Sequence, residues 1–235
     1  MKLGLILPFL LGACQLPSAA LPPVADYITV TITDGENVIH APSILVKKNQ
    51  SAEMVSDDIV VRVDKNHSVE VLTTDPNMGE NLVVDVDVRT AGEVQFEKMK
   101  SLAGEWEAVE GDFGSPMITY EVSSGGHSVI ERLFPGEDYE MVSMYHMQNG
   151  RLAMTHYCSI GNQPFLMAKP SVGNTIDFKF IKLGNMKDKN EHHIRTLQMV
   201  FHAEDEITAN WSSYKNNAPV TEPGASFHVK RVKRY

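Results

Sequence analysis

Residues 155–164 gather an unusual density of chemically capable side chains within one short stretch of the chain. An imidazole and a phenol can move a proton or hydrogen-bond a ligand, and a thiol can act as a nucleophile or a soft metal ligand. Two carboxamides offer both donors and acceptors. The groups belong to His156, Tyr157, Cys158, Asn162 and Gln163. This segment is therefore the first candidate for a functional site.

Apolar runs flank the segment at 151–154 and 165–168, and such runs are typical of β-strands. Side chains along a strand alternate between its two faces. We therefore expect His156 and Cys158 on one face, and Thr155, Tyr157 and Ser159 on the other. Whichever set points inward must be hydrogen-bonded or line a cavity.

A second inward polar group is expected at Glu131, which shares a strand face with Val129 and Leu133. A carboxylate inside a β-structure needs a donor or a cation, and we expect His156 or Arg132 to supply it. Each candidate also has a structural interpretation, as a core histidine, a turn residue or a core tryptophan. The predicted ligand-binding residues are Glu131, His146, His156, Tyr157, Asn162, Gln163, His193 and Trp211.

Three kinds of chemistry remain open. The first is binding of a small apolar or amphipathic molecule, against a wall of methionines at 141, 144, 154, 167 and 199. The second is acid/base catalysis by His156 with Glu131 or Tyr157, although the chain has no Gly-x-Ser-x-Gly motif. The third is a metal site, for which no Cys-x-x-Cys or His-x-x-x-His spacing is present. We expect binding, with no catalytic residue and no metal ligand; a structural barrel with a filled interior is the other alternative.

The start of the chain predicts export. Met1-Lys2, the apolar run 3–11 and Gly12-Ala13-Cys14 have the order of a signal peptide. Residues 11–14 also resemble a bacterial lipobox, in which Cys14 is lipidated, and Gln15 then implies the outer membrane facing the periplasm. Cleavage after Ala20 would instead give a soluble periplasmic protein. The membrane is thus an expected partner through a lipid anchor.

Charge and cysteine content narrow the classes further. The formal net charge is −9 and no basic stripe is present, which argues against a nucleic-acid partner. The chain has two cysteines. With Cys14 lipidated or removed, Cys158 has no partner for a disulfide, so the fold must be held by its core.

Composition divides the chain near residue 93. Residues 15–25 hold three prolines and predict a linker. Residues 26–92 carry 12 acidic against 5 basic side chains and alternate in hydrophobicity over 27–33, 37–40, 43–47, 58–63, 68–72 and 82–88. They predict a small antiparallel β-module, whose expected role is spacing or contact with another envelope protein. Residues 93–102 have a helical period that ends at Gly104.

Residues 93–235 predict an antiparallel barrel. Strand patterns cover 117–122, 128–134, 139–147, 151–158, 165–168, 175–182, 194–202, 206–214 and 226–232. Glycine-containing turns separate them at 125–126, 135–136, 149–150, 173–174 and 223–224. This regular spacing favours a closed up-and-down barrel entered through a short helix, with a sandwich as the alternative.

Several motifs carry a family resemblance. Gly104-Glu-Trp106 looks like the Gly-x-Trp start of the first strand in lipocalin-like (calycin-type) barrels. With Glu131-Arg-Leu-Phe-Pro-Gly136, His192-His193 and Asn210-Trp211, residues 95–233 resemble an uncharacterised bacterial family of such barrels, distantly similar to nitrobindin-type haem barrels. The resemblance implies an all-β, lipocalin-like fold. It also makes haem a candidate cofactor, held through His193, His202 or His228.

Overall fold

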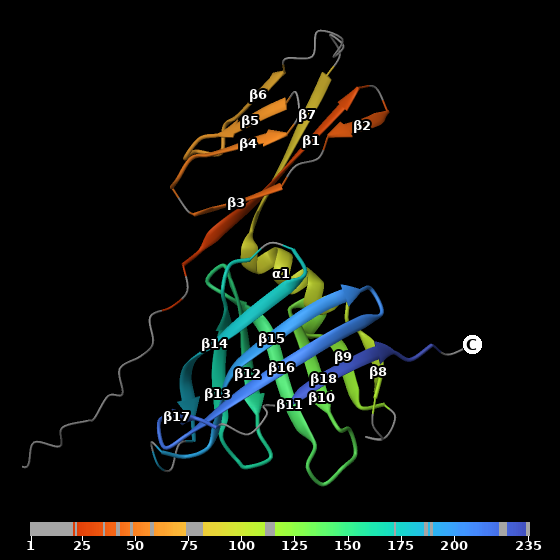
Figure 1. The fold of residues 1–235 in the computed structure, drawn as a ribbon, viewed down its shortest axis with the longest axis vertical. Helices are drawn as coiled ribbons and strands as arrows, with labels where there is room; N and C mark the ends of the chain where they lie inside the picture. Colours follow the sequence, from red (N-terminus) through yellow and green to blue (C-terminus); the bar gives the residue numbers. More distant parts are fainter. Residues whose placement is uncertain are drawn as a thin grey trace, which may run out of the picture.

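The computed structural model describes residues 21, 23–34, 36–40, 43–47, 49–56, 59–73, 82–110, 116–171, 173–185, 188, 190–220 and 225–233. The expected signal peptide, Cys14 and most of the linker lie outside these residues. So does the expected turn at 223–224. The described part forms a β-module and a barrel, with a short helix between them (Figure 1).

Ten antiparallel strands of the described residues close into an up-and-down barrel. They are β8 (Gly104–Ala108), β9 (Ile118–Ser123), β10 (Ser128–Leu133), β11 (Met141–Gln148), β12 (Arg151–Tyr157), β13 (Gln163–Ala168), β14 (Thr175–Gly184), β15 (His193–Ala203), β16 (Glu206–Lys215) and β18 (Ser226–Arg231). Each pairs with its neighbour in this order, and β18 pairs with β8 to close the ring. The 3-10 turn η1 (Ser124–Gly126) joins β9 to β10, and β17 (Ala218–Pro219) adds a short pairing to β16.

The predicted fold class is confirmed, and the predicted barrel strands differ from the observed ones by a few residues at their ends. The turn between β11 and β12 illustrates why such hairpins could be predicted from the sequence. Asn149 and Gly150 both adopt positive φ, 51° and 73°, which is the backbone of the tight turn that suits a two-residue hairpin. Asparagine and glycine are the residues that tolerate this conformation best.

The barrel interior is packed with side chains from every wall. Its buried cluster includes Trp106, Tyr145, Leu152, Met154 and Met199, each with no accessible surface. Inward and outward residues alternate along the strands, as along β12, where Leu152, Met154 and His156 are buried inside and Tyr157 is exposed.

Helix α1 (Ala91–Lys100) closes one end of the barrel with Phe96 and Met99 in the core. It begins two residues before the predicted start, because Thr90 caps it: the Glu93 backbone N–H donates to the Thr90 hydroxyl and the Glu93 carboxylate accepts from the Thr90 N–H. Gly92 lies directly against the β11–β12 turn. A Cβ there would stand 2.7 Å from the Gly150 carbonyl oxygen.

Arg231, near the end of the last strand, joins three parts of this closed end. Its guanidinium lies over the Trp106 ring, 4.5 Å from the centroid. Its N–H groups donate to the carbonyls of Ser101 and Ala103 after α1, and to that of Glu204 in the β15–β16 turn. Trp106 donates its own Nε1–H to the Leu102 carbonyl. The Gly-x-Trp motif thus marks the floor of the barrel.

The module before the helix consists of two described sheets. One contains β1 (Ala25–Asp34), which pairs with β2 (Asn37–His40), β3 (Ser43–Lys47) and β7 (Leu82–Thr90); the other runs β4 (Ala52–Ser56), β5 (Ile59–Val63), β6 (Val69–Thr73). Ile28, Val30 and Ile32 of β1 pack against Val61 and Val63 of β5. Strand β4 was not predicted, because its apolar residues lack a clean alternation.

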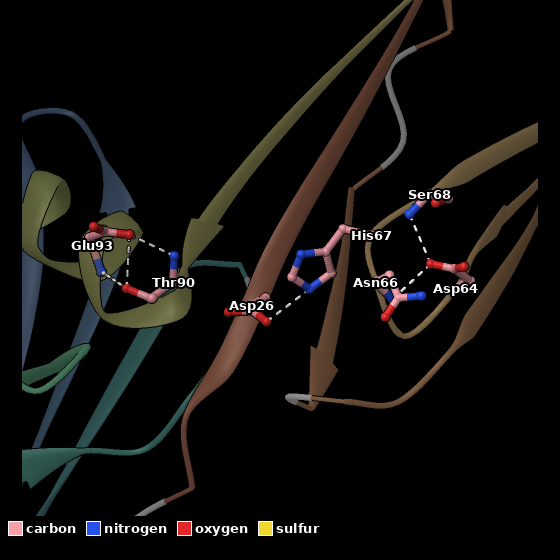
Figure 2. A network of polar contacts seen from close by, with 7 residues as sticks. All are labelled: Asp26, Asp64, Asn66, His67, Ser68, Thr90 and Glu93. Atoms are coloured by element: carbon pink, nitrogen blue, oxygen red, sulfur yellow. Dashed lines mark hydrogen bonds and ion pairs between the residues drawn. The ribbon is translucent and has the colours of Figure 1, made fainter.

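The module reaches the helix through its longest pair of strands. Asp26 of β1 lies opposite Thr90 of β7, and Thr90 is the helix cap. The β5–β6 turn is attached to the same point, since His67 Nε2 lies 3.1 Å from Asp26 Oδ2 (Figure 2). Asp64 shapes that turn by accepting from the backbone N–H groups of Asn66 and Ser68. None of the helices in the described ranges has the length and apolar character needed to cross a bilayer.

Candidate functional site

Four polar side chains form a row across the inner wall of the barrel. Tyr120 of β9 lies opposite Glu131 of β10, Glu131 opposite Ser143 of β11, and Ser143 opposite His156 of β12. All four are buried. Residues directly opposite on antiparallel strands share a face, so the strand register alone brings them together.

Glu131 is the centre of this row and has no accessible surface. Its carboxylate accepts from the hydroxyl of Tyr120 at 2.8 Å and from that of Tyr145 at 3.0 Å, and the Ser143 hydroxyl also bonds to it. Burial raises the pKa of Glu131, and the hydroxyl donors oppose this rise. Burial and the neighbouring Glu131 charge raise the pKa of both tyrosines well above their usual value. The expected partners of Glu131 were wrong: Arg132 bonds to Glu140 and His156 bonds to Ser143.

His156 continues the network toward the other side of the barrel. Its Nδ1 lies 3.0 Å from the Ser143 hydroxyl, and its ring centroid is 5.0 Å from that of Trp211 on β16. Burial lowers the pKa of His156 to about 4, so the ring is neutral at pH 7. With Glu131 ionised, the single Ser143 proton goes to the carboxylate. His156 then donates through Nδ1 and keeps a lone pair on Nε2.

This polar row lies inside a filled barrel. The accessible surface is zero for Glu131, Ser143 and Tyr145, and 1% for His156. A ligand or substrate could reach Glu131 only by displacing packed side chains. Around Glu131, the buried row is therefore a structural network rather than a binding site.

The end of the barrel opposite α1 is different, and we call it the rim. Here Asn162, in the turn between β12 and β13, holds the segment before β15. Its Nδ2 donates to the Glu191 carboxylate at 2.9 Å and to the His192 carbonyl at 2.8 Å. Asn162 has no accessible surface, and His193 beside it is 5% exposed.

Polar atoms at the rim lack partners. His193 Nδ1 lies 2.8 Å from the Glu191 carbonyl, which can only accept, so Nδ1 carries a proton, and the tautomer with one ring proton has its lone pair on Nε2. Among the described residues, three buried side-chain atoms have no hydrogen-bond partner: His193 Nε2, Asn162 Oδ1 and Trp211 Nε1. They comprise two acceptors and one donor. Such atoms are costly to bury unless water or a ligand satisfies them.

The other side of the rim is aromatic. Phe227 of β18 lies opposite Ala209, two positions from Trp211 on the inner face of β16. Phe134 packs on Phe227 with centroids 5.7 Å apart, and Tyr139 on Phe134 at 5.1 Å. Phe134 holds a φ of 54°, a strained backbone for an aromatic residue. A cavity of about 250 Å³ adjoins this cluster, and it is lined by Ala108, Glu110, Met117, Ser226, Phe227 and the outward-facing His228.

The structure separates the predicted site residues into groups. Glu131 and His156 belong to the buried row, Trp211 packs against His156 at the end of that row, and Asn162 and His193 lie at the rim. His146 lies on the outer face of β11 against Phe165, Tyr157 is 46% exposed, and Gln163 bonds to Gly161 within its turn. Cys158, beyond the end of β12, forms no disulfide with any described residue.

Sequence reasoning missed Tyr120, Ser143 and Tyr145, and the aromatic cluster of the rim. The period-two pattern places Tyr120 on the Ile118 face and Tyr145 on the Ser143 face, but it cannot say which strands become neighbours. Glu131 could have led to them, because a buried carboxylate requires donors from the adjacent strands.

The described residues do not fit the haem that the resemblance implies. His202 and His228 lie on the outer face, where His202 bonds to Thr208 and His228 to Glu206. His193 has a free Nε2, but the barrel beneath it is filled. No group of three His, Cys, Asp or Glu side chains within the described ranges is placed to hold a metal ion.

Fold and site together define an antiparallel up-and-down β-barrel with a helix-closed floor and a partly unsatisfied rim. The closed ten-stranded barrel of the described residues is consistent with a lipocalin-like barrel. No protein-family model matches the chain, and no curated protein matches it.

Proposed function

We propose that this protein is an exported, lipid-anchored barrel that binds a small amphipathic molecule at its rim. The observation that carries the proposal is the set of three unpartnered buried atoms, His193 Nε2, Asn162 Oδ1 and Trp211 Nε1. Binding sites are commonly apolar surfaces with a few placed polar groups, and the rim combines both.

The chemistry of these atoms selects the polar end of the ligand. Two acceptors and one donor are matched by a carboxamide, whose NH2 carries two protons and whose oxygen accepts, whereas a hydroxyl satisfies the donor and one of the two acceptors. A carboxylate has no proton for the two acceptors, and an ammonium cannot accept from the Trp211 N–H. The apolar part would lie against Phe227 and Phe134.

The filled interior supports a second function, that of a structural envelope barrel without a ligand. It also argues against the acid/base enzyme, because both Glu131 and His156 are buried and engaged with neighbouring hydroxyls. The distinction between rim binding and a purely structural barrel is open to a direct experiment.

The experiment is a titration of the full chain with N-phenyl-1-naphthylamine, a neutral fluorescent amphiphile. Competition with decanamide, decanol, decanoate and decylamine then ranks the polar ends. We expect saturable binding, with decanamide displacing the probe best. Trp211→Phe and His193→Gln should each weaken binding by about five- to tenfold, the value of one hydrogen bond.

His202→Gln is the matched control for His193→Gln, because His202 is an exposed histidine on the same strand. It should leave binding unchanged. Absence of saturable binding would overturn the proposal in favour of the structural barrel. Equal binding by wild type, Trp211→Phe and His193→Gln would place any ligand away from the rim.

A further inference from the structure

We propose that β7 of the N-terminal module is a docking edge that adds a strand from a partner protein, and that this strand alternates apolar and basic residues. The inference concerns the module and is independent of the rim. Strand β7 is nine residues long, and in the described residues it pairs with β1 alone. Its other edge therefore offers a row of backbone N–H and C=O groups.

The side chains of β7 show that this edge is unfinished. Val84 and Val88 lie opposite Ile32 and Ile28, so they share the face that forms the module core. Yet Val84 is 41% exposed and Val88 is 38% exposed, whereas Ile28 and Ile32 are fully buried. A further strand beside β7 would cover both valines and extend the core by one strand.

Native sheets usually protect such an edge with lysine, proline, a bulge or a very short strand. Strand β7 has no lysine, proline or bulge: it pairs with β1 in unbroken register over its whole length, and its charged residues, Asp85, Asp87 and Arg89, all lie on the face opposite Val84 and Val88. A long, regular, apolar edge of this kind is the usual receptor for β-strand addition.

The charges on β7 select the partner. Asp85, Asp87 and Arg89 are exposed on the opposite face from Val84 and Val88, and Arg89 Nε pairs with Asp87 Oδ2 at 2.8 Å. Among the described residues, Asp85 is therefore the charge of this face that no ion pair engages, and the segment 26–92 carries 12 acidic against 5 basic side chains. Opposite charges across a strand pair stabilise it. The added strand should therefore place apolar residues on the core side and lysine or arginine on the Asp85 side.

The same charges disfavour self-pairing of two copies in the register centred on Val86, whereas a register centred on Asp87 would place Asp87 opposite Asp87 and Asp85 opposite Arg89 of the other copy. Antiparallel self-pairing centred on Val86 would place Asp85 of each copy opposite Asp87 of the other. Like charges directly opposite are destabilising, and this register would bring two such pairs together. One end of β7 is also fixed in place, because β7 runs beside β1 into the helix cap at Thr90 (Figure 2).

The test uses the full chain and a fluorescein-labelled short peptide in which valine and lysine alternate. Anisotropy reports binding, and hydrogen exchange with mass spectrometry locates it. We expect saturable binding and new protection of the amides of 82–90. The same peptide with every backbone nitrogen methylated keeps its charges but cannot form the ladder, and it should bind at least about tenfold more weakly.

Two variants of the chain complete the design. Asp85→Lys reverses an exposed charge without touching the core, and Val88→Lys places a charge at the uncovered edge; each should weaken binding about tenfold. Val122→Lys on β9 is the control, because Val122 is exposed to the same extent as Val88, and it should bind like wild type.

Equal binding of the methylated and unmethylated peptides would overturn strand addition and leave simple charge attraction. Protection outside 82–90, or wild-type binding by both β7 variants, would place the contact elsewhere. A concentration-dependent dimer with 82–90 protected in the absence of peptide would overturn the proposal in favour of self-pairing. No peptide binding in any form would also reject it.

Discussion

A single buried carboxylate organises the interior of this barrel. Glu131 can be accommodated without accessible surface because three hydroxyls from the strands on either side of it bond to its oxygens. Removing one partner of a buried charge leaves a group that no water can reach. Removing one of these hydroxyls should therefore destabilise the protein more than the small change in side-chain size suggests.

Tyr145→Phe should lower the free energy of unfolding by about 1–3 kcal/mol, because Glu131 Oε2 then loses its 3.0 Å donor. The matched control is Tyr157→Phe, since Tyr157 is exposed on the neighbouring strand; it should change stability by less than about 0.5 kcal/mol. Urea unfolding followed by circular dichroism measures both. Equal effects of the two variants would contradict the donor role of Tyr145.

Because burial lowers the pKa of His156, the free energy of unfolding should depend on pH. This pKa falls from 6.5 in the unfolded chain to about 4 in the folded protein. A lowered pKa in the folded state means that the unfolded state binds the proton first as pH falls. The contribution of His156 is therefore present above pH 6.5 and is lost between pH 6.5 and 4, by up to about 3 kcal/mol.

The measurement compares unfolding free energies of wild type and His156→Gln across this range. Glu131 contributes with the opposite sign, since its raised pKa lowers stability as pH rises, but this contribution is common to both proteins. The difference between the two curves should narrow as the pH falls. His202→Gln should follow wild type, and a constant difference would refute the assignment to His156.

At the scale of elements, the position of helix α1 depends on a close contact between its backbone and the β11–β12 turn, and less on the helix propensity of its residues. Glycine usually weakens a helix, so Gly92→Ala would be expected to stabilise one in isolation by about 1 kcal/mol. Here the added Cβ would lie 2.7 Å from the Gly150 carbonyl oxygen and 2.8 Å from Arg151 Cα. Both are backbone atoms, which cannot move aside cheaply.

Gly92→Ala should therefore destabilise the protein, by roughly 2 kcal/mol or more. Glu97→Ala at an exposed position of the same helix is the control, and it should be close to neutral. Thermal unfolding of the two variants shows whether each substitution raises or lowers the melting temperature. A rise in melting temperature for Gly92→Ala would show that the helix can lift from the turn.

At the scale of the whole molecule, Arg231 connects the parts of the chain that meet at the closed end of the barrel. Arg231 connects the last strand to the first strand, through Trp106, and to the end of α1 and the β15–β16 turn. Arg231→Lys keeps the charge but loses the planar fork that bonds several carbonyls at once. It should lower the free energy of unfolding by about 1–3 kcal/mol.

Lys230→Gln is the neighbouring control, because Lys230 is exposed and lies 3.5 Å from Glu206. It should change stability by less than about 0.5 kcal/mol. Urea unfolding monitored by tryptophan fluorescence is suitable, since Trp106 itself reports on the clamp. Equal stability of wild type and Arg231→Lys would mean that the barrel closes through its strand ladder alone.

The sequence by itself predicted the barrel strands, the helix and the alternation of side chains along each strand. Alternation along 128–134 placed Glu131 inward with Val129 and Leu133, and the turn at Asn149-Gly150 marked a hairpin because those residues accept positive φ. These features depend on neighbours in the chain, which is why they could be read locally.

Only the tertiary structure decided which residues meet. Whether Glu131 is paired with Arg132, His156 or the hydroxyls of Tyr120 and Tyr145 depends on strand register and on the inward face being closed to water. Likewise, His156 and Trp211 are distant in sequence and become neighbours only because the ring closes. The edge of β7 that is unpaired among the described residues has the same origin: pairing is a property of the assembled sheet, and no local pattern records which edge is left over.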